Sequence, residues 1–409
     1  MPIVVQKYGG SSVADIQRIQ AVAGRVIEAK RRGDDVVVVV SAMGDTTDDL
    51  LEMAHEVTPV PNGRELDLLL TAGERIAMSL LAIAVNAEGY RASSYTGSQA
   101  GIVTDTEHGK ARIIDIRPGR IREALERGDV VIVAGFQGVS TAYDVTTLGR
   151  GGSDTTAVAL AAALGAPVCE IYTDVPGVFT ADPRIVPGAR RLHAVSYEEM
   201  LEMAVSGARV LQSRSVEYAR NNRILLHVRS SFVDEPGTWI REEDQRMEQA
   251  IIAGVTHDDS EAKVTLEAIS GGSSSTAAIF RALAAEGVNV DMIVQNPPRE
   301  GLLDVSFTIP KADIPRARAA VERTQVKAGR MTTDDGIGKV SLVGAGMRTH
   351  PGVAAEMFSA LAEEGIDIDM VSTSPIRISC VIRIEDVPRA VRILHERFAL
   401  SGEEAVREH

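Results

Sequence analysis

The hydrophobic pattern of the first half of the chain predicts strands that alternate with helices. Residues 3–6, 35–41 and 129–139 are rich in apolar residues, which is typical of strands covered on both faces of a parallel sheet. Between them, apolar residues recur at helical spacing, as in residues 16–27. This alternation predicts an α/β fold with a mostly parallel sheet and helices on both of its faces.

The same alternation of strands and helices continues to about residue 231, and a charged stretch follows it. Short apolar runs predict strands at residues 168–172 and 225–231, and the charged stretch at residues 234–249, with Pro236 and Gly237, predicts a linker. Helical periodicity predicts further helices over residues 48–55, 65–86 (interrupted at 71–75), 157–164, 197–205 and 208–220.

An internal repeat follows the predicted linker. The run FRALAAEGVNVDMIV begins at Phe280, and FSALAEEGIDIDMVS begins at Phe358, 78 residues later. Each copy predicts the order strand, helix, strand, strand, helix, a small α/β sandwich. We therefore divide the chain into residues 1–245, 246–330 and 331–409, with approximate boundaries because two such repeats can be interleaved.

Composition narrows the classes of function. A chain of 409 residues suggests two or three domains, and 44% hydrophobic with 24% charged residues is globular. The net charge of −14 argues against a nucleic-acid binder, although nucleotide substrates need only a local cationic site. Cys169 and Cys380 lack the neighbours of a zinc or redox motif. With no secretory leader and no apolar run approaching roughly 20 residues, we expect a cytoplasmic protein without a membrane span.

The turn TLGRGGSDTT, residues 147–156, joins a strand-like run to a buried helix. Its glycines let backbone N–H groups approach a ligand closely, and the first turn of a helix directs unpaired N–H groups at it. Arg150 adds a positive charge suited to a carboxylate or phosphate. Ser153 or Asp154 could instead only cap the helix. Capping requires neither Arg150 nor three glycines within four residues, so we predict an anion-binding turn.

A second strand, glycine turn and helix begins at KYGGSS, residues 7–12. This turn matches neither GxxxxGK[ST] nor GxGxxG. Lys7 could simply be solvated, but two glycines and two serines beside it favour a phosphate against the helix start. Glu74, in the interruption TAGER, is either an ordinary solvated residue or a ligand for substrate. We retain Lys7 and Glu74 as candidate site residues.

A third candidate loop, TDVPGVFTADPR, occupies residues 173–184 directly after a predicted strand. Prolines, a glycine, two aspartates and an arginine beyond a strand are typical of ligand loops in open α/β sheets. A plain surface turn is the alternative interpretation.

Together these motifs resemble those of the aspartokinases over essentially the whole chain. They occur in that family's order, and the duplicated C-terminal unit resembles the paired ACT domains that bind regulatory amino acids. The resemblance implies an N-terminal amino-acid-kinase-type α/β/α sandwich followed by two ferredoxin-like ACT units. The motifs that carry it are KYGGSS at Lys7, SAMGDTTD at Ser41, TAGER at Thr71, FQGV at Phe136, TTLGRGGSDTT at Thr146 and TDVPGVFTADPR at Thr173.

The resemblance implies phosphoryl transfer from ATP, with Mg²⁺, to the side-chain carboxylate of L-aspartate. The product would be 4-phospho-L-aspartate, on the route to lysine, threonine and methionine. A carboxylate is already ionised at pH 7 and needs no general base, so catalysis is expected to rest on positioning and charge neutralisation.

The resemblance also implies roles for individual residues. Lys7, Asp154 and Glu74 are expected to be catalytic, with Lys7 stabilising charge on the transferred phosphoryl group. No residue is assigned to a metal, and Arg209 stands where the family often has lysine. The residues expected to bind aspartate are Thr47, Glu74, Arg150, Gly151, Gly152 and Ser153. Those expected to bind ATP are Lys7, Tyr8, Gly9, Gly10, Ser11, Ser12, Thr173, Asp174, Phe179, Asp182, Arg184 and Arg209.

The predicted effector site departs from the family's pattern at three positions. Gly271 and Pro375 replace acidic residues, and Asp367 replaces an asparagine. Two carboxylates missing from a site for an ammonium group favour weakened inhibition by threonine, alone or with lysine; a rearranged site is the alternative. The residues expected to contact the effector are Asp291, Gln295, Thr349, His350, Asp367, Ile368 and Ser374.

Two other functions remain open from the sequence. One is another amino-acid kinase, acting on glutamate or acetylglutamate, and the other is a non-catalytic ACT-based amino-acid sensor. Because ACT units commonly pair across chains, we expect a homo-oligomer or a complex with a shorter ACT-only subunit. Met247 lies where an internal start of such a subunit could fall.

Overall fold

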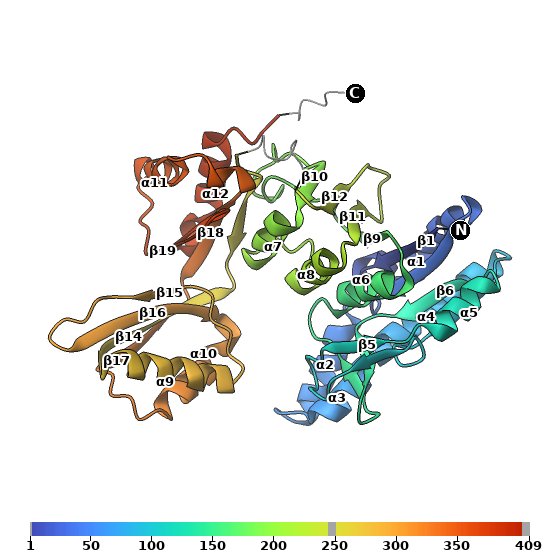
Figure 1. Ribbon diagram of the computed structural model, residues 1–409, viewed down its shortest axis with the longest axis horizontal. Coiled ribbons are helices and arrows are strands. Elements are labelled where there is room, and N and C mark those ends of the chain that lie inside the picture. The colour runs from blue at the N-terminus through green and yellow to red at the C-terminus, as the bar shows by residue number, and fades with distance from the viewer. Residues whose placement is uncertain (1, 244–250, 403–409) are drawn as a thin grey trace. The chain divides into compact units, whose positions relative to one another are not determined.

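The computed structural model describes residues 2–243 and 251–402, so Met247 lies outside the described residues (Figure 1). Contacts divide the chain into two compact units. The first contains residues up to 178, 191–204 and 209–243, and the second contains residues 179–190, 205–208 and those from 251 onward. Each unit is described separately below.

The first unit is built on an eight-stranded sheet with the order β10-β12-β11-β9-β1-β2-β6-β3. The strands β11, β9, β1, β2, β6 and β3 are parallel to one another, whereas β12 runs antiparallel to β11. The mostly parallel sheet predicted from the apolar runs is confirmed. The strand bounds are β1 Ile3–Tyr8, β2 Asp35–Val40, β3 Ala92–Tyr95, β6 Val130–Ala134, β9 Val168–Thr173, β10 Ala194–Ser196, β11 Leu225–Ser230 and β12 Thr238–Arg241.

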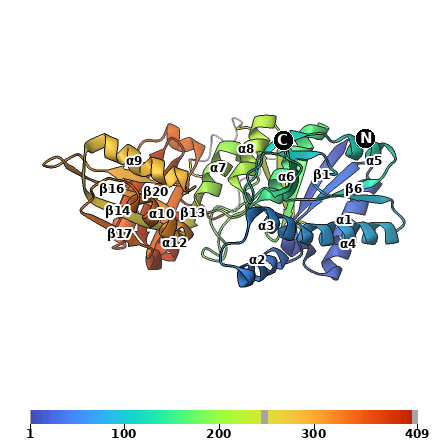
Figure 2. The ribbon, with the colours of Figure 1, turned by 90° about the horizontal axis from the view of Figure 1, so that it is seen from below.

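Helices cover both faces of this sheet, as predicted. Figure 2 shows β1 and β6 between helix α6 (Gly152–Leu164) on one side and helices α1 (Ile16–Arg31) and α4 (Ala72–Ala87) on the other. Buried residues of α1 and α4 form one hydrophobic core with β2 and β6. The helix α6 contacts β1, β2 and β9, and α8 (Ser213–Asn222) packs against α6. The carboxyl ends of β1, β2 and β9 thus share one edge of the sheet.

A smaller sheet with the order β5-β4-β7-β8 belongs to the same unit. Its strands are β4 Ile102–Thr104, β5 Ile113–Ile116, β7 Gln137–Ser140 and β8 Val145–Thr147. Strand β8 ends just before the glycine turn at residues 149–152 and so leads the chain into α6. The helices α2 (Thr46–Val57), α3 (Gly63–Leu70), α5 (Gly119–Glu126) and α7 (Tyr197–Val205) complete the unit.

Three predicted elements differ from the observed ones. The run at residues 129–139 is two strands in different sheets, because the chain turns at Gly135 and Phe136, where Phe136 adopts φ 68°. The stretch predicted as a linker contains β12, which pairs with β10 and β11. The helix predicted from residue 208 begins only at Ser213, after Gly207 turns the chain at φ 103°.

The longest apolar helical stretch runs through α3 and α4. Among the described residues, Gly63–Ala87 is long and apolar enough to cross a membrane by length and composition, although no apolar run of that length was expected from the sequence. Its side chains Ala77, Leu81 and Val85 belong to the core under α1, which explains their apolar character within a folded unit.

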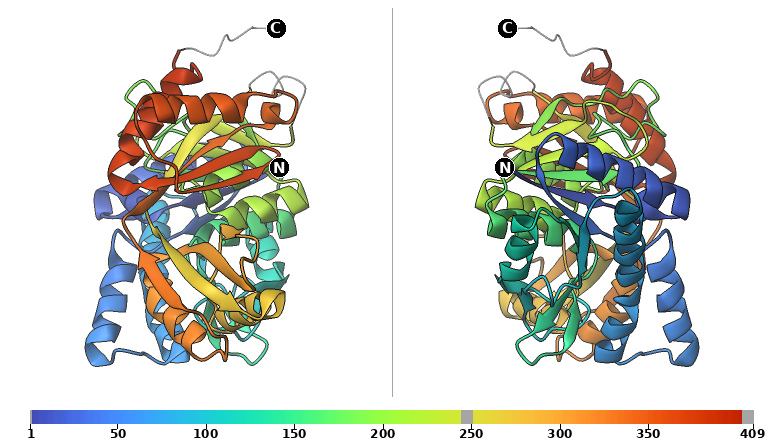
Figure 3. Two further views of the ribbon diagram at one scale, coloured as in Figure 1. Left: turned by 90° about the vertical axis from the view of Figure 1, so that its left-hand side faces the viewer. Right: turned by 90° about the vertical axis from the view of Figure 1, so that its right-hand side faces the viewer.

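The second unit contains two four-stranded sheets, visible on the left of Figure 3. Every strand pair in them is antiparallel, and two helices pack on one face of each sheet. The predicted order strand, helix, strand, strand, helix is confirmed in both repeats. The first repeat contains β14 Glu261–Ser270, α9 Gly272–Ala285, β15 Ile293–Gln295, β16 Leu302–Pro310, α10 Ile314–Glu322 and β17 Arg330–Asp334; the second contains β18 Ile337–Val343, α11 Val353–Glu363, β19 Met370–Ser374, β20 Arg377–Arg383 and α12 Val387–Arg397.

Segments from before the first repeat complete the second sheet and its core. Strand β13 (Gly254–Asp258) pairs with β18, so the chain contributes a strand to the second sheet before it enters the first. The backbone N–H of Val255 donates to the carbonyl of Thr180 at 2.7 Å. Ala181 and Val186 are buried in the core of the second sheet. Part of the loop predicted to bind nucleotide therefore belongs to the second unit.

The two repeats are joined by ion pairs exchanged between corresponding residues. Lys339 Nζ, from the second repeat, lies 2.5 Å from Asp291 Oδ2 and 2.9 Å from Glu261 Oε1 in the first. Lys263 Nζ, its counterpart in the first repeat, lies 2.6 Å from Asp369 Oδ2 in the second. The Lys339 side chain is only 1% exposed, whereas Lys263 is 21% exposed. Corresponding lysines of the two repeats therefore each pair with carboxylates of the other repeat, and the Lys339 pairs are more buried than the Lys263 pair.

Candidate active site

The two glycine turns predicted to bind anions meet at the carboxyl edge of the large sheet. Lys7 is on β1 and Asp154 is in the first turn of α6, and Lys7 Nζ lies 2.6 Å from Asp154 Oδ1. Both side chains are almost buried, at 12% and 8% exposure. An ion pair shielded from water in this way holds its groups far more firmly than one at the surface. It fixes an ammonium beside the start of a helix, where anions are favoured.

The first turn of α6 decides between the two interpretations of Asp154. The N-cap residue is Gly151, in the left-handed conformation at φ 71°, and no side chain makes a capping hydrogen bond there. Ser153 and Asp154 are both buried inside the first turn. Asp154 is therefore not a helix cap, and its carboxylate is committed to Lys7 instead.

Arg150 is presented to solvent by the glycines on either side of it. Gly149 and Gly151 have φ of 76° and 71°, a conformation that side-chain-bearing residues rarely adopt. Between them Arg150 is exposed, and it has no ion-pair partner within residues 2–243 and 251–402. A guanidinium that the fold leaves unpaired beside a helix start is available to a carboxylate or phosphate of a ligand.

Glycines also shape the loop after β1. A Cβ added at Gly9 would lie 3.4 Å from Lys7 Nζ, so the backbone of Gly9 lies close beside the ammonium. A Cβ at Gly10 would lie 3.0 Å from the carbonyl oxygens of both Ala42 and Gly44. The loop after β1 therefore packs directly on the loop after β2, which leads into α2 and its half-buried Thr47.

Glu74 is buried behind these loops, at 3% exposure. Its Oε1 accepts a hydrogen bond from the backbone N–H of Ala42 at 3.3 Å, and its Oε2 has no partner among the described residues. Burial raises the pKa of Glu74 from 4.5 to about 7, against the opposing effect of hydrogen bonds from backbone N–H groups of Glu74 and Ala42. Gly73 allows this placement, because a Cβ there would lie 2.7 Å from Ala42 Cβ. A buried carboxylate with one unsatisfied oxygen is suited to receive a cationic group.

Ser231, which the sequence did not point to as a site residue, connects the loop after β1 to β9. Ser12 Oγ donates to Ser231 Oγ at 2.9 Å, and the Ser231 backbone N–H donates to the carbonyl of Thr173, also at 2.9 Å. Asp174 follows Thr173 and is exposed, and the hydroxyl of Thr173 donates to its carboxylate at 3.1 Å. Ser231 stands at the end of a predicted strand without a motif around it, so the sequence carried no signal for it.

The other residues predicted to bind ATP occupy varied environments. The Tyr8 ring is fully buried and stacked on Tyr172 at 4.7 Å, so its side chain is part of the core. Arg209 is exposed in the first unit. Phe179, Asp182 and Arg184 belong to the second unit, where Arg184 Nη2 lies 2.7 Å from Asp182 Oδ2. Hydrogen bonding from Arg184 lowers the pKa of Asp182. The predicted nucleotide residues therefore divide between the two units.

The predicted effector residues all lie in the second unit, and several are already hydrogen-bonded. The Asp291 carboxylate pairs with Lys339, and Gln295 Oε1 accepts from Thr276 Oγ1 at 3.1 Å. His350 Nδ1 lies 2.8 Å from the carbonyl of Gly346. Of the remaining predicted effector residues, Asp367 is exposed and Thr349, Ile368 and Ser374 are exposed to half-buried.

The backbone at Gly271 explains one departure from the expected effector pattern. Gly271 precedes α9 with φ 92°, and a Cβ there would lie 2.6 Å from Ser275 Oγ. An aspartate at this position would strain the backbone, and the Ser275 hydroxyl would have to move. The loop before α9 is thus built for glycine, not for an acidic side chain.

Comparison with known proteins places the chain in a family. The profile of the Amino acid kinase family matches residues 2–230, and an ACT domain profile matches residues 273–325 and 340–398. An aspartokinase of Mycolicibacterium smegmatis is 57% identical over 99% of this chain and 98% of its own. Escherichia coli aspartokinase III in complex with aspartate and ADP is 25% identical, with a TM-score of 0.83 over 97% of this chain and 99% of its own. The same enzyme in complex with lysine and aspartate gives a TM-score of 0.73 at the same identity and coverage. The chain belongs to the aspartokinase family.

Proposed function

We propose that this enzyme transfers the γ-phosphoryl group of ATP to the side-chain carboxylate of L-aspartate, forming 4-phospho-L-aspartate and ADP. The observation that carries the proposal is the ion pair of Lys7 and Asp154, 2.6 Å apart at the sheet edge where both anion-binding turns meet. A related kinase, Escherichia coli aspartokinase III, has been crystallised with aspartate and ADP. The reaction would supply lysine, threonine and methionine synthesis in the cytoplasm.

In the proposed reaction an oxygen of the aspartate side chain attacks the γ-phosphorus. The bond from that phosphorus to the bridging oxygen of ADP breaks, and ADP leaves with the electron pair. No proton needs to be removed, so the reaction requires no general base. Lys7 neutralises charge on the transferred group, held in place by Asp154, while the backbone and hydroxyl groups of Gly9 to Ser12 bind phosphate.

We assign the rest of the aspartate to two groups of opposite charge. Arg150 binds the α-carboxylate, and Glu74, with its unsatisfied Oε2, receives the α-ammonium. Thr47, Gly151, Gly152 and Ser153 surround the substrate. Thr173, Asp174, Phe179, Asp182, Arg184 and Arg209 are the residues proposed to bind the nucleotide.

Magnesium fits this chemistry as an ion carried by the nucleotide. Mg²⁺ usually takes one or two carboxylates together with phosphate oxygens and water. No group of three or more metal-binding side chains occurs within the described residues, whereas Asp174 is an exposed carboxylate directly after β9. Asp174 could hold the ion, which when bound would neutralise phosphate charge.

The choice of acceptor can be tested with a hydroxamate assay on aspartate, glutamate and acetylglutamate. We expect product with aspartate alone. For acetylglutamate the reason is that it lacks the free ammonium that Glu74 would receive. Product with one of the other acceptors instead would indicate a different amino-acid kinase. If none of the three acceptors supports ATP consumption, a non-catalytic sensor is favoured.

We also propose that inhibition by threonine, alone or with lysine, is weakened in this enzyme. Gly271 cannot be replaced by an acidic residue without strain, and Asp291 is held by Lys339. Each missing charge-assisted hydrogen bond to the effector's ammonium removes roughly 1.5–3 kcal/mol. Titration of the activity with both amino acids tests this, and half-inhibition at micromolar concentrations would contradict it.

Association with further chains is proposed from the edges of the two small sheets. Strands β15 and β19 are edge strands, and each exposes an apolar residue at the corresponding position, Ile293 and Val371. Unpaired edge strands of this kind favour pairing with another chain. A homo-oligomer or a complex with a shorter ACT-only subunit would cover them.

A further inference from the structure

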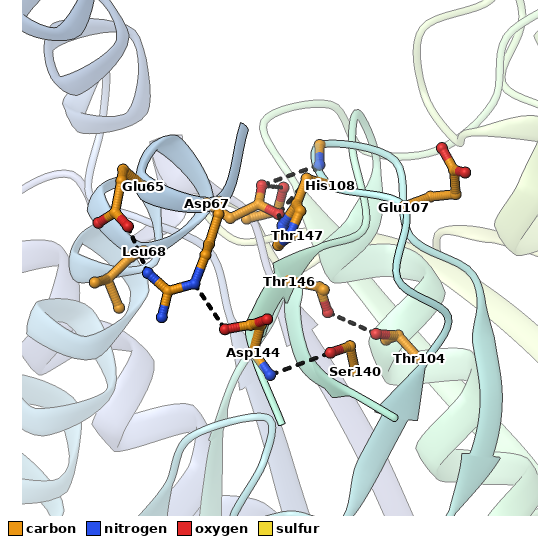
Figure 4. A network of polar contacts seen from close by, with 12 residues as sticks. Glu65, Asp67, Leu68, Thr104, Glu107, His108, Ser140, Asp144, Thr146 and Thr147 are labelled. Atoms are coloured by element: carbon orange, nitrogen blue, oxygen red, sulfur yellow. Dashed lines mark hydrogen bonds and ion pairs between the residues drawn. The ribbon is translucent and has the colours of Figure 1, made fainter. Parts of the chain in front are cut away.

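A buried carboxylate outside the proposed site organises the strand that leads to Arg150. Asp67 lies in the middle of α3 and is only 1% exposed (Figure 4). Its oxygens accept hydrogen bonds from the backbone N–H of Gly109 at 3.1 and 3.2 Å and from the Thr147 hydroxyl at 2.5 Å. His108 Nδ1 lies 2.7 Å from Asp67 Oδ2. A buried carboxylate is costly unless it is satisfied in this way.

Thr147, the last residue of β8, lies only three residues before Arg150. Its hydroxyl is held by Asp67, and its carbonyl accepts from the backbone N–H of Ala111 at 2.9 Å. Both anchors come from segments distant in the sequence. They fix the position from which the glycine turn departs.

Arg214, at the start of α8, holds Leu148, the residue after Thr147. Its Nη1 donates to the carbonyl of Leu148 at 2.9 Å, and its Nη2 donates to the carbonyl of Ala111 at the same distance. The Leu148 backbone N–H donates to the carbonyl of Phe136 at 2.8 Å. Every backbone polar group of Leu148 is therefore bonded, and its side chain is buried.

Beyond Leu148 the glycines on either side of Arg150 tie the turn to α6. The carbonyl of Gly151 accepts from the backbone N–H of Thr155 at 3.1 Å and from its hydroxyl at 3.2 Å. The Gly152 N–H donates to the carbonyl of Gly149 at 2.9 Å, and Arg150 itself is exposed between two left-handed glycines. The placement of the Arg150 guanidinium therefore depends on residues 147 and 148 on one side of the turn and on the start of α6 on the other. Misplacement of a binding group by about 1 Å can cost on the order of 100-fold in rate.

We infer that Asp67 and Arg214 are positioning residues for aspartate binding, which hold Thr147 and Leu148 so that Arg150 meets the substrate carboxylate. Neither residue needs to touch a substrate in this role. The inference rests on the proposed role of Arg150. It predicts a selective loss of aspartate binding, with nucleotide binding unchanged.

The matched variants Thr147→Val and Thr147→Ser test the inference with little change of volume. Thr147→Val removes the hydroxyl that Asp67 holds, and Thr147→Ser keeps it. We expect Thr147→Val and Asp67→Asn to raise the KM for aspartate by about 10-fold or more, with the KM for ATP within about twofold of wild type. Thr147→Ser should restore most of the affinity for aspartate. Thermal melting of each variant shows whether it is folded.

A double-mutant cycle with Arg150→Gln separates this inference from the proposed site. If Asp67 acts through Arg150, Thr147→Val should have little further effect on the KM for aspartate once Arg150 is replaced. Fully additive effects, or equal losses for aspartate and ATP, would overturn the inference. An Arg150→Gln enzyme with unchanged KM for aspartate would instead contradict the proposed role of Arg150.

Discussion

At the residue scale, Glu74 shows how burial sets up a site for a cation. Its carboxylate has one hydrogen bond from the backbone of Ala42 and one oxygen without a partner. Ionising such a group in the empty site is unfavourable, and a bound ammonium removes that cost. The sequence indicated only that Glu74 lay among apolar neighbours beside a glycine; it could not show the approach of Ala42, which lies in the loop after β2.

The raised pKa of Glu74 predicts a pH dependence of aspartate binding. Since ionised Glu74 binds the ammonium and its pKa is about 7, affinity should rise by about tenfold between pH 6 and pH 8. Calorimetric titration of aspartate without nucleotide measures this. Glu74→Gln should bind weakly at both values, and a wild-type affinity that does not change with pH would contradict the assignment.

The same shift predicts how stability depends on pH. A carboxyl whose pKa is raised on folding favours the folded state at low pH, and this contribution is lost as the pH rises from 4.5 to about 7. At pH 8, Glu74→Gln should therefore raise the free energy of unfolding, by about 3 kcal/mol at most. Chemical denaturation at pH 4 and pH 8 checks this, since the gain should be present only at the higher value.

At the element scale, the site depends on close packing between helices and loops. Most elements were predictable because apolar periodicity reports burial directly, as in α1, β2 and β18. The split of residues 129–139 was not, because the pattern is apolar on both sides of Gly135 and only the left-handed turn at Phe136 separates β6 from β7. The network around Asp67 was equally hidden, since a polar residue on an amphipathic helix usually faces water.

The close packing at Gly73 predicts how a substitution there would affect helix α4. A Cβ there would lie 2.7 Å from that of Ala42, so Gly73→Ala should push α4 away from the loop after β2 and cost about 1–3 kcal/mol of stability. Glu74 would move with the helix, so the KM for aspartate should rise. Gly24→Ala is the control, because Gly24 is exposed in α1 with nothing within 4 Å of an added Cβ. Gly24→Ala should gain about 0.5–1 kcal/mol of stability. A similar loss of stability in both variants would refute the packing argument.

At the scale of the whole molecule, the repeat found in the sequence becomes a reciprocal connection between two ACT sheets. The 78-residue spacing indicated two similar units but not how they meet, since the exchanged partners are read only from the fold. Carboxylates Glu261 and Asp291 surround the buried Lys339. Burial alone would lower the pKa of Lys339, but the two carboxylates raise it above its ordinary value.

Replacing the buried Lys339 should strongly lower the free energy of unfolding of the second unit. Lys339→Met leaves Glu261 and Asp291 without a counter-charge, and breaking a buried pair typically costs about 3–5 kcal/mol. Lys263→Met breaks the more exposed counterpart with Asp369, where roughly 0.2–1 kcal/mol is expected. Denaturation of both variants measures the difference, and equal losses would show that burial does not distinguish the two pairs.

The central claim is that the edge where Lys7 meets Asp154 transfers phosphate to aspartate. The direct measurement is aspartate-dependent ATP consumption by the full chain and by Lys7→Ala, with folding of the variant verified by its melting temperature. We predict that wild type consumes ATP only when aspartate is present, and that Lys7→Ala folds normally but loses roughly 100- to 1000-fold in kcat. ATP consumption independent of aspartate, or a Lys7→Ala enzyme of near-wild-type rate, would contradict the claim.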